Sequence, residues 1–201
     1  MWQYERNARK KGYSIIAGID EAGRGPLAGP VVSAAVILPD AFFCKEINDS
    51  KKLTGKKREE LFPRIMNQAV AVGTGIASHR EIDRINILQA SLLSMKRAVE
   101  NLSRYPDFLL IDGQFTIDIP VDQSAIVKGD AKSMSIAAAS IIAKVTRDAI
   151  MRDFHDKFSQ YNFVQHKGYP TKAHKQAVRD HGPSPVHRLS FKGVKETAYD
   201  R

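Results

Sequence analysis

Four acidic residues stand where an apolar run of the sequence meets a glycine-containing turn. Asp20 and Glu21 directly follow one such run and precede a glycine-rich segment. Asp112 ends a second run, and Asp130 follows a third. Strand ends that converge on one edge of a sheet are where α/β proteins place their chemistry. Carboxylates gathered there repel one another unless cations hold them, so the pattern predicts Mg²⁺ or Mn²⁺ acting on a phosphate.

Each acid also has an ordinary structural interpretation. An Asp-Glu pair is most often a solvated turn, Asp112-Gly113 is a common turn dipeptide, and Asp130 precedes a helix cap at Ser133. The combination favours chemistry, because four carboxylates suit two hard cations that bridge a scissile phosphate.

The turn Gly23-Arg24-Gly25 follows the first acidic pair. Glycines allow backbone N–H groups to approach a ligand closely, and an arginine can fork onto a phosphate. The segment from Gly23 to Ala28 also satisfies a dinucleotide-binding fingerprint, which requires a helix to begin inside the loop. Two prolines and an apolar run from Val31 predict a strand there instead, so the dinucleotide interpretation is weak.

Other polar residues are less specific. Tyr169 is the one aromatic residue in a polar loop; it is either a packing residue or a ring that stacks on a sugar or base. No histidine pair has the spacing of a helical metal site, so most histidines are expected on the surface or in loops. These histidines are His155, His166, His174, His181 and His187. The basic residues of two later segments are solvated or contact a polyanion backbone. They are Lys144, Arg147, Arg152, Lys157, Lys167, Lys172 and Lys175.

Composition agrees with a polyanionic partner. The 201 residues include 31 Lys and Arg against 22 Asp and Glu, a formal net charge of +9, and neutralising phosphates releases counterions. Cys44 is the only cysteine, which excludes an internal disulfide and a zinc site built on several thiolates. No stretch approaches the ~18 apolar residues of a membrane span, so we expect a soluble, cytoplasmic protein.

Apolar periodicity predicts an α/β fold with a mixed sheet. Strands are expected at 14–19, 31–38, 70–76, 108–111 and 124–127, the first two forming an antiparallel pair. A helix is expected over 51–70 with a kink at Pro63, followed by a short helix that a Ser78–Glu81 capping box opens. Longer helices are expected after Asn86 and from Ser133 to Phe158, and a last helix from Thr171 to His181.

Six segments together resemble ribonuclease HII, the bacterial type 2 ribonuclease H, over nearly the whole chain. The segments are Gly18–Val31, Asn48–Leu53, Leu110–Gly113, Val127–Asp130, Ser135–Asp148 and His166–Thr171. The resemblance implies an RNase H-like mixed β-sheet flanked by helices, with 1–201 as a single type 2 domain and a small C-terminal helical extension over about 171–201.

The resemblance also assigns roles to residues. It places the catalytic, metal-binding acids at Asp20, Glu21, Asp112 and Asp130. It places the turn that detects the ribonucleotide 2′-hydroxyl at Gly23, Arg24 and Gly25, and the junction-sensing tyrosine at Tyr169. Ser50 and Lys51 match a phosphate-contacting stretch.

The implied activity is endonucleolytic cleavage of the RNA strand of RNA–DNA hybrids and of duplex DNA 5′ of a single embedded ribonucleotide. Two Mn²⁺ or Mg²⁺ ions would activate the water and stabilise the departing 3′-oxygen, leaving 5′-phosphate and 3′-hydroxyl ends. A monomer that removes RNA primers and misincorporated ribonucleotides is expected. Two alternatives stay open at this point: a module that clamps hybrids without cutting them, and another RNase H-like nuclease such as a junction resolvase.

Overall fold

A mixed sheet of five strands forms the centre of the computed structural model, which describes residues 1–47 and 53–198. The strands are β1 (Ile16–Ala22), β2 (Val31–Ile37), β3 (Ala71–Ala77), β4 (Phe108–Asp112) and β5 (Asp122–Ile126). They lie in the order β3-β2-β1-β4-β5. The pairs β1–β2 and β2–β3 are antiparallel, whereas β1–β4 and β4–β5 are parallel. The expected mixed sheet and the antiparallel first pair are confirmed.

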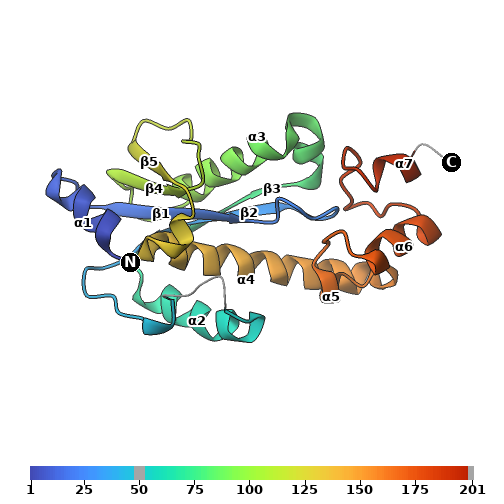
Figure 1. Ribbon diagram of the computed structural model, residues 1–201, viewed down its shortest axis with the longest axis horizontal. Coiled ribbons are helices and arrows are strands. Elements are labelled where there is room, and N and C mark those ends of the chain that lie inside the picture. Colours follow the sequence, from blue (N-terminus) through green and yellow to red (C-terminus); the bar gives the residue numbers. More distant parts are fainter. Residues whose placement is uncertain (48–52, 199–201) are drawn as a thin grey trace.

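Helices cover both faces of this sheet (Figure 1). The α-helices are α1 (Gln3–Lys10), α2 (Gly55–Gln68), α3 (His79–Glu100), α4 (Met134–Lys157), α5 (Phe163–His166), α6 (Lys172–His181) and α7 (Lys195–Ala198). Two 3-10 turns, η2 (Gly129–Ala131) and η3 (Ser159–Tyr161), flank α4. Helix α3 packs on one face, and α4 packs on the other with α2 outside it (Figure 1). Helices α6 and α7 lie beyond one end of the sheet (Figure 1).

Helix α4 lies unusually close to β1. A Cβ added to Gly18 would stand 2.2 Å from the carbonyl carbon of Ser135 and 2.3 Å from the nitrogen of Ile136. Only a glycine on the strand permits this approach, and the small residues Ala137–Ala139 of the helix are buried in the same core. This packing fixes α4 against the strand that ends in Asp20 and Glu21.

Side-chain caps set most helix starts. Ser78 and Glu81 form the expected capping box, and Ser133 and Thr171 cap α4 and α6 as expected. Helix α2 begins at Gly55 after a cap by Thr54, later than the expected start at residue 51, and it runs through Pro63. Asn86 has φ 67° inside α3, which divides a short first segment from the longer one that follows, as expected.

Candidate active site

The strand ends bring the predicted acids to one edge of the sheet. Ile19 of β1 pairs with Ile111 of the parallel strand β4, so Asp20 and Asp112 follow at the same level on neighbouring strands. The Asp112 Oδ1 atom accepts a hydrogen bond of 2.6 Å from the backbone N–H of Gly129. This bond ties the 3-10 turn η2, and with it Asp130, to the end of β4. Strand pairing and one loop contact thus position acids that are up to 110 residues apart in the sequence.

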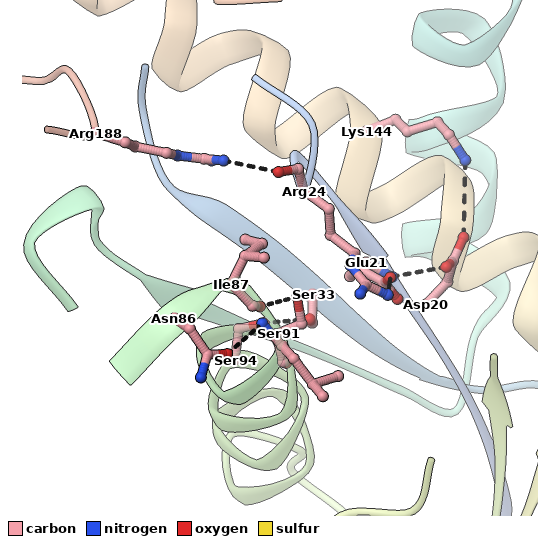
Figure 2. Close-up of polar contacts among 11 residues, drawn as sticks. Asp20, Glu21, Arg24, Ser33, Asn86, Ile87, Ser91, Ser94, Lys144 and Arg188 are labelled. Atoms are coloured by element: carbon pink, nitrogen blue, oxygen red, sulfur yellow. Dashed lines mark hydrogen bonds and ion pairs between the residues drawn. The ribbon is translucent and has the colours of Figure 1, made fainter. Parts of the chain in front are cut away.

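Burial dominates the electrostatics of Asp20 and Glu21. Burial is the main reason that the pKa of Asp20 is raised to about 8, and the charges of Glu21 and Asp112 act in the same direction. Burial also raises the pKa of Glu21, with a further contribution from Asp112. A cation opposes each shift: Lys144 Nζ lies 3.7 Å from Asp20 Oδ2, and Arg24 Nη1 lies 3.3 Å from Glu21 Oε1. Figure 2 shows Lys144 of α4 reaching down to Asp20.

The donor set fits hard divalent cations. Carboxylate oxygens are the ligands that Mg²⁺ prefers, and the buried Glu21 Oε2 atom has no hydrogen-bond partner among the described residues. In the described ranges, however, no three acidic, histidine or cysteine side chains gather into a preformed metal-binding group. The lysine and arginine beside Asp20 and Glu21 therefore supply the positive charge at this edge in the structure.

A buried arginine fixes the backbone of the turn Gly23-Arg24-Gly25 through hydrogen bonds. Arg188, which is 0% exposed, donates to the carbonyls of Gly23 at 2.6 Å and Arg24 at 3.0 Å; Figure 2 shows the second contact. Because N–H and C=O point in opposite directions across a trans peptide, two inward carbonyls leave the N–H groups of Arg24 and Gly25 facing outward. Gly23 itself has φ +99°, a backbone conformation that favours glycine.

A second buried arginine corrects one sequence expectation. Arg147 was grouped with solvated or backbone-contacting cations, but it is buried and bonded to three protein carbonyls. These belong to Pro30 at 3.0 Å, Lys167 at 3.0 Å and Ala28 at 3.1 Å. Arg147 and Arg188 thus join α4 and the C-terminal segment to the glycine-rich loop. No helix begins in that loop, and β2 starts at Val31, which removes the structural basis of the dinucleotide interpretation.

Tyr169 stands beside this turn with an exposed ring. Its side chain is 48% exposed, and a Cβ added to Gly25 would lie 3.6 Å from Tyr169 Cε1. Both residues line a cleft of about 380 Å³, whose lining also includes Glu21 and Lys144. The structure therefore places one catalytic candidate, the turn and the tyrosine along a single cleft.

Ser50 and Lys51 lie outside the described residues. The expectation that most histidines lie on the surface or in loops is wrong for His166 and His174, which are buried in helices; His187 lies in a loop but is also buried. Their sequence context, a polar loop and an amphipathic helix, contains no pattern that predicts burial. Arg188 was missed for the same reason, because its role depends on contacts with a loop about 160 residues earlier.

Fold and site define a class: an α/β protein whose acids sit at the edge of a mixed sheet, next to a cleft with basic residues, as in RNase H-like nucleases. Comparison with known sequences is more specific. The sequence model of the family Ribonuclease HII matches residues 17–194. The Ribonuclease HII of Geobacter sulfurreducens is 54% identical over 196 residues, which cover 98% of this chain and 90% of that protein. The chain therefore belongs to the ribonuclease HII family.

Solved structures confirm the RNase H-like fold. The ribonuclease H2 of Pyrococcus horikoshii OT3 superimposes with a TM-score of 0.76 at 25% identity, covering 92% of this chain and 97% of that one. Bst-RNase HIII, solved in complex with Mn²⁺, gives a TM-score of 0.71 at 20% identity, covering 95% and 71% of the two chains. Family membership supports a nuclease that hydrolyses nucleic acid. Within residues 1–47 and 53–198, no helix is both long and apolar enough to cross a membrane.

Proposed function

We propose that this protein is a metal-dependent endoribonuclease that cuts the RNA strand of RNA–DNA hybrids. We further propose that it cuts duplex DNA on the 5′ side of a single embedded ribonucleotide. The observation that carries the proposal is the cleft that leads from Glu21, past Gly23-Arg24-Gly25, to the exposed ring of Tyr169. A strand in this cleft meets an acidic site first and a backbone donor surface next, which is the arrangement that cleavage beside a sugar hydroxyl requires.

Asp20, Glu21, Asp112 and Asp130 are the proposed metal ligands and catalytic residues. When bound, two Mg²⁺ or Mn²⁺ ions would activate a water and stabilise the departing 3′-oxygen, giving 5′-phosphate and 3′-hydroxyl ends. The chain's own contribution is to hold the carboxylates at one level of the sheet, through the strand register at Ile19 and Ile111. Lys144 and Arg24, which neutralise Asp20 and Glu21 in the structure, are placed to meet a phosphate once cations take over that task.

Substrate selection is proposed to rest on Gly23, Arg24, Gly25 and Tyr169. The outward N–H groups of the turn can bond a ribose 2′-hydroxyl, the group that distinguishes RNA from DNA. The tyrosine ring, next to Gly25, would stack on the following sugar and lie flat where that sugar lacks a hydroxyl. Together the two contacts define a ribonucleotide followed by a deoxyribonucleotide.

The remaining parts of the proposal concern the wider substrate and the cell. Ser50 and Lys51 are proposed to contact a phosphate of the bound strand, and the net charge of +9 favours such a polyanion. We propose that the protein acts as a monomer on hybrids and ribonucleotide-containing DNA, and that it removes RNA primers and misincorporated ribonucleotides.

Isosteric changes at the acids test the proposed chemistry. Asp112→Asn and Asp130→Asn keep the side-chain volume but remove a charge, so hybrid cleavage in Mg²⁺ should fall by orders of magnitude while hybrid binding in Ca²⁺ survives. Asp118→Asn is the matched control, because this acid follows β4, as Asp112 ends it, but is fully exposed and pairs with Lys96 at 3.6 Å. Cleavage by Asp130→Asn at the wild-type rate would remove Asp130 from the ligand set. The cleavage assay is also run on the wild-type protein with Mg²⁺ removed and then restored. If the protein binds the hybrid but does not cut it after Mg²⁺ is restored, it is a module that clamps hybrids without cutting them.

A further inference from the structure

A chain of hydrogen bonds connects buried histidines to the backbone of Tyr169. His187 is 1% exposed and His174 0% exposed, and neither ring lines the cleft described above. Ser184 donates its backbone N–H to His187 Nδ1 at 2.9 Å. The His187 and His174 Nε2 atoms are 3.0 Å apart, and His174 Nδ1 lies 2.9 Å from the carbonyl oxygen of Tyr169.

The hydrogen-bond partners at the two ends, Ser184 and Tyr169, determine which ring nitrogens of His187 and His174 carry a proton. The backbone N–H of Ser184 can only donate, so His187 Nδ1 accepts from it; the Ser184 hydroxyl, 2.7 Å from the same nitrogen, can donate as well, and the ring carries its proton on Nε2. That proton is donated to His174 Nε2, which leaves the His174 proton on Nδ1. The carbonyl of Tyr169 can only accept, and His174 Nδ1–H faces it. Every bond is therefore satisfied by one pair of neutral tautomers.

A third histidine holds the other side of the same loop. His166 Nδ1 accepts from the backbone N–H of Gly168 at 3.1 Å, and its Nε2 atom lies 2.8 Å from the carbonyl of Tyr161. The His166 and His174 rings stack with centroids 4.3 Å apart. The Gly168 carbonyl in turn accepts from the N–H of Leu27, within the glycine-rich loop. The two peptide units that precede and follow the Tyr169 Cα are thus anchored in the interior, whereas the ring is exposed.

The electrostatics agree with a neutral pair. Burial is the main cause that lowers the pKa of His174 to about 4 and that of His187 to about 3; the charge of His166 also lowers the pKa of His174, and the charge of His174 lowers that of His187. At neutral pH both rings therefore remain uncharged, which is the state that the hydrogen-bond chain requires.

We propose that Ser184, His187 and His174 form a positioning relay, which fixes the backbone of Tyr169 so that its ring meets the sugar next to the cleaved ribonucleotide. The inference rests on the proposed function of Tyr169. The relay touches no substrate. It acts through the carbonyl of Tyr169, and it connects the segment after α6 to a residue that lines the cleft.

The test compares two substrates in one enzyme preparation. Cleavage of duplex DNA with a single ribonucleotide is divided by cleavage of a continuous RNA–DNA hybrid, so that any inactive fraction cancels. His174→Leu removes the donor to Tyr169 at similar volume, and the ratio should fall roughly tenfold, the scale of one lost buried hydrogen bond. His174→Asn keeps an N–H near the position of Nδ1 and should restore much of the ratio. His181→Leu, an exposed histidine of the same helix, is the control and should leave the ratio unchanged.

A double-mutant cycle separates positioning from general damage. If the relay acts through the ring, His174→Leu should change the ratio strongly in the wild-type background and hardly at all when combined with Tyr169→Ala. Equal losses on both substrates in His174→Leu, or an undiminished effect in the double variant, would overturn the relay. A Tyr169→Ala protein with the wild-type ratio would instead overturn the proposed role of Tyr169, so the two failures are distinguishable.

Discussion

Gly18→Ala tests whether the approach of α4 to β1 is as close as the structure has it. The new Cβ would lie 2.2 Å from the Ser135 carbonyl carbon, and ordinary contacts begin near 3.4 Å, so the helix must move by about 1.2 Å. Both nearest atoms belong to the helix backbone, which cannot rotate away as a side chain can. Overpacking of this kind costs about 1–3 kcal/mol and occasionally more. At about 3 kcal/mol, Tm should fall by roughly 6–12 °C in a chain of this size.

Gly55→Ala is the matched control for this substitution. A Cβ at Gly55 would meet nothing nearer than the Arg58 guanidinium at 4.0 Å, and the residue begins helix α2. Alanine favours a helix over glycine by up to about 1 kcal/mol, so this variant should be as stable as wild type or slightly more stable. Urea and thermal unfolding of both variants measure these differences in stability from wild type. A Gly18→Ala protein that melts within roughly 2 °C of wild type would refute the packing argument.

Three further predictions concern charge. Hydrogen bonds from the Arg97 side chain lower the pKa of Glu81 to about 2. Glu81→Gln keeps the cap but should cost about 1 kcal/mol in urea unfolding above pH ~4.5, and the gap should close as pH falls from there toward 2. The unfolded chain protonates its histidines near pH 6.5, whereas buried His174 and His187 resist protonation down to about 4 and 3. As pH falls from 6.5 to 4, these two histidines should lower the unfolding free energy by up to about 2.7 kcal/mol per pH unit, while the raised pKa of Asp20 acts in the opposite direction. The difference in unfolding free energy between wild type and His174→Leu isolates the contribution of His174, and a difference that stays constant over this pH range would contradict its burial. Affinity for uncut hybrid in Ca²⁺ should drop steeply with added salt, because contacts with phosphates release counterions. A salt-independent affinity would mean that the +9 net charge does not contribute to binding.

Much of the fold follows from local patterns in the sequence. Alternating or continuous apolar runs predicted each strand, and the caps at Ser78, Ser133 and Thr171 predicted where three helices begin. The convergence of Asp20 and Asp112 at one edge of the sheet was also predicted, because each acid follows an apolar run that predicts a buried strand. These signals are local, so one chain segment suffices to detect each.

The parts that the sequence did not predict depend on long-range contacts. Arg147 and Arg188 look like ordinary surface cations in the sequence, but carbonyls of the glycine-rich loop allow them to be buried. The same holds for His174 and His187, which satisfy each other only after α6 and the segment behind it pack together. The expected start of α2 at Lys51 was too early, because the spacing of Leu61, Ile65 and Ala69 does not show where the helix begins, whereas Thr54 supplies the cap. The Thr54 cap is a local signal, whereas the burial of the two arginines and two histidines depends on contacts between distant segments, which a short window of residues does not contain.

The most direct test of the central claim uses a DNA duplex that carries one ribonucleotide. Incubated with Mg²⁺ or Mn²⁺, the protein should cut once, on the 5′ side of that ribonucleotide, and leave a 3′-hydroxyl and a 5′-phosphate, while the all-DNA duplex stays intact. The cut position and end groups can be determined by gel sizing before and after phosphatase treatment. If the single-ribonucleotide duplex stays uncut with both metals, or if the all-DNA duplex is cut equally well, a 2′-hydroxyl-detecting ribonuclease site is the wrong account of this cleft.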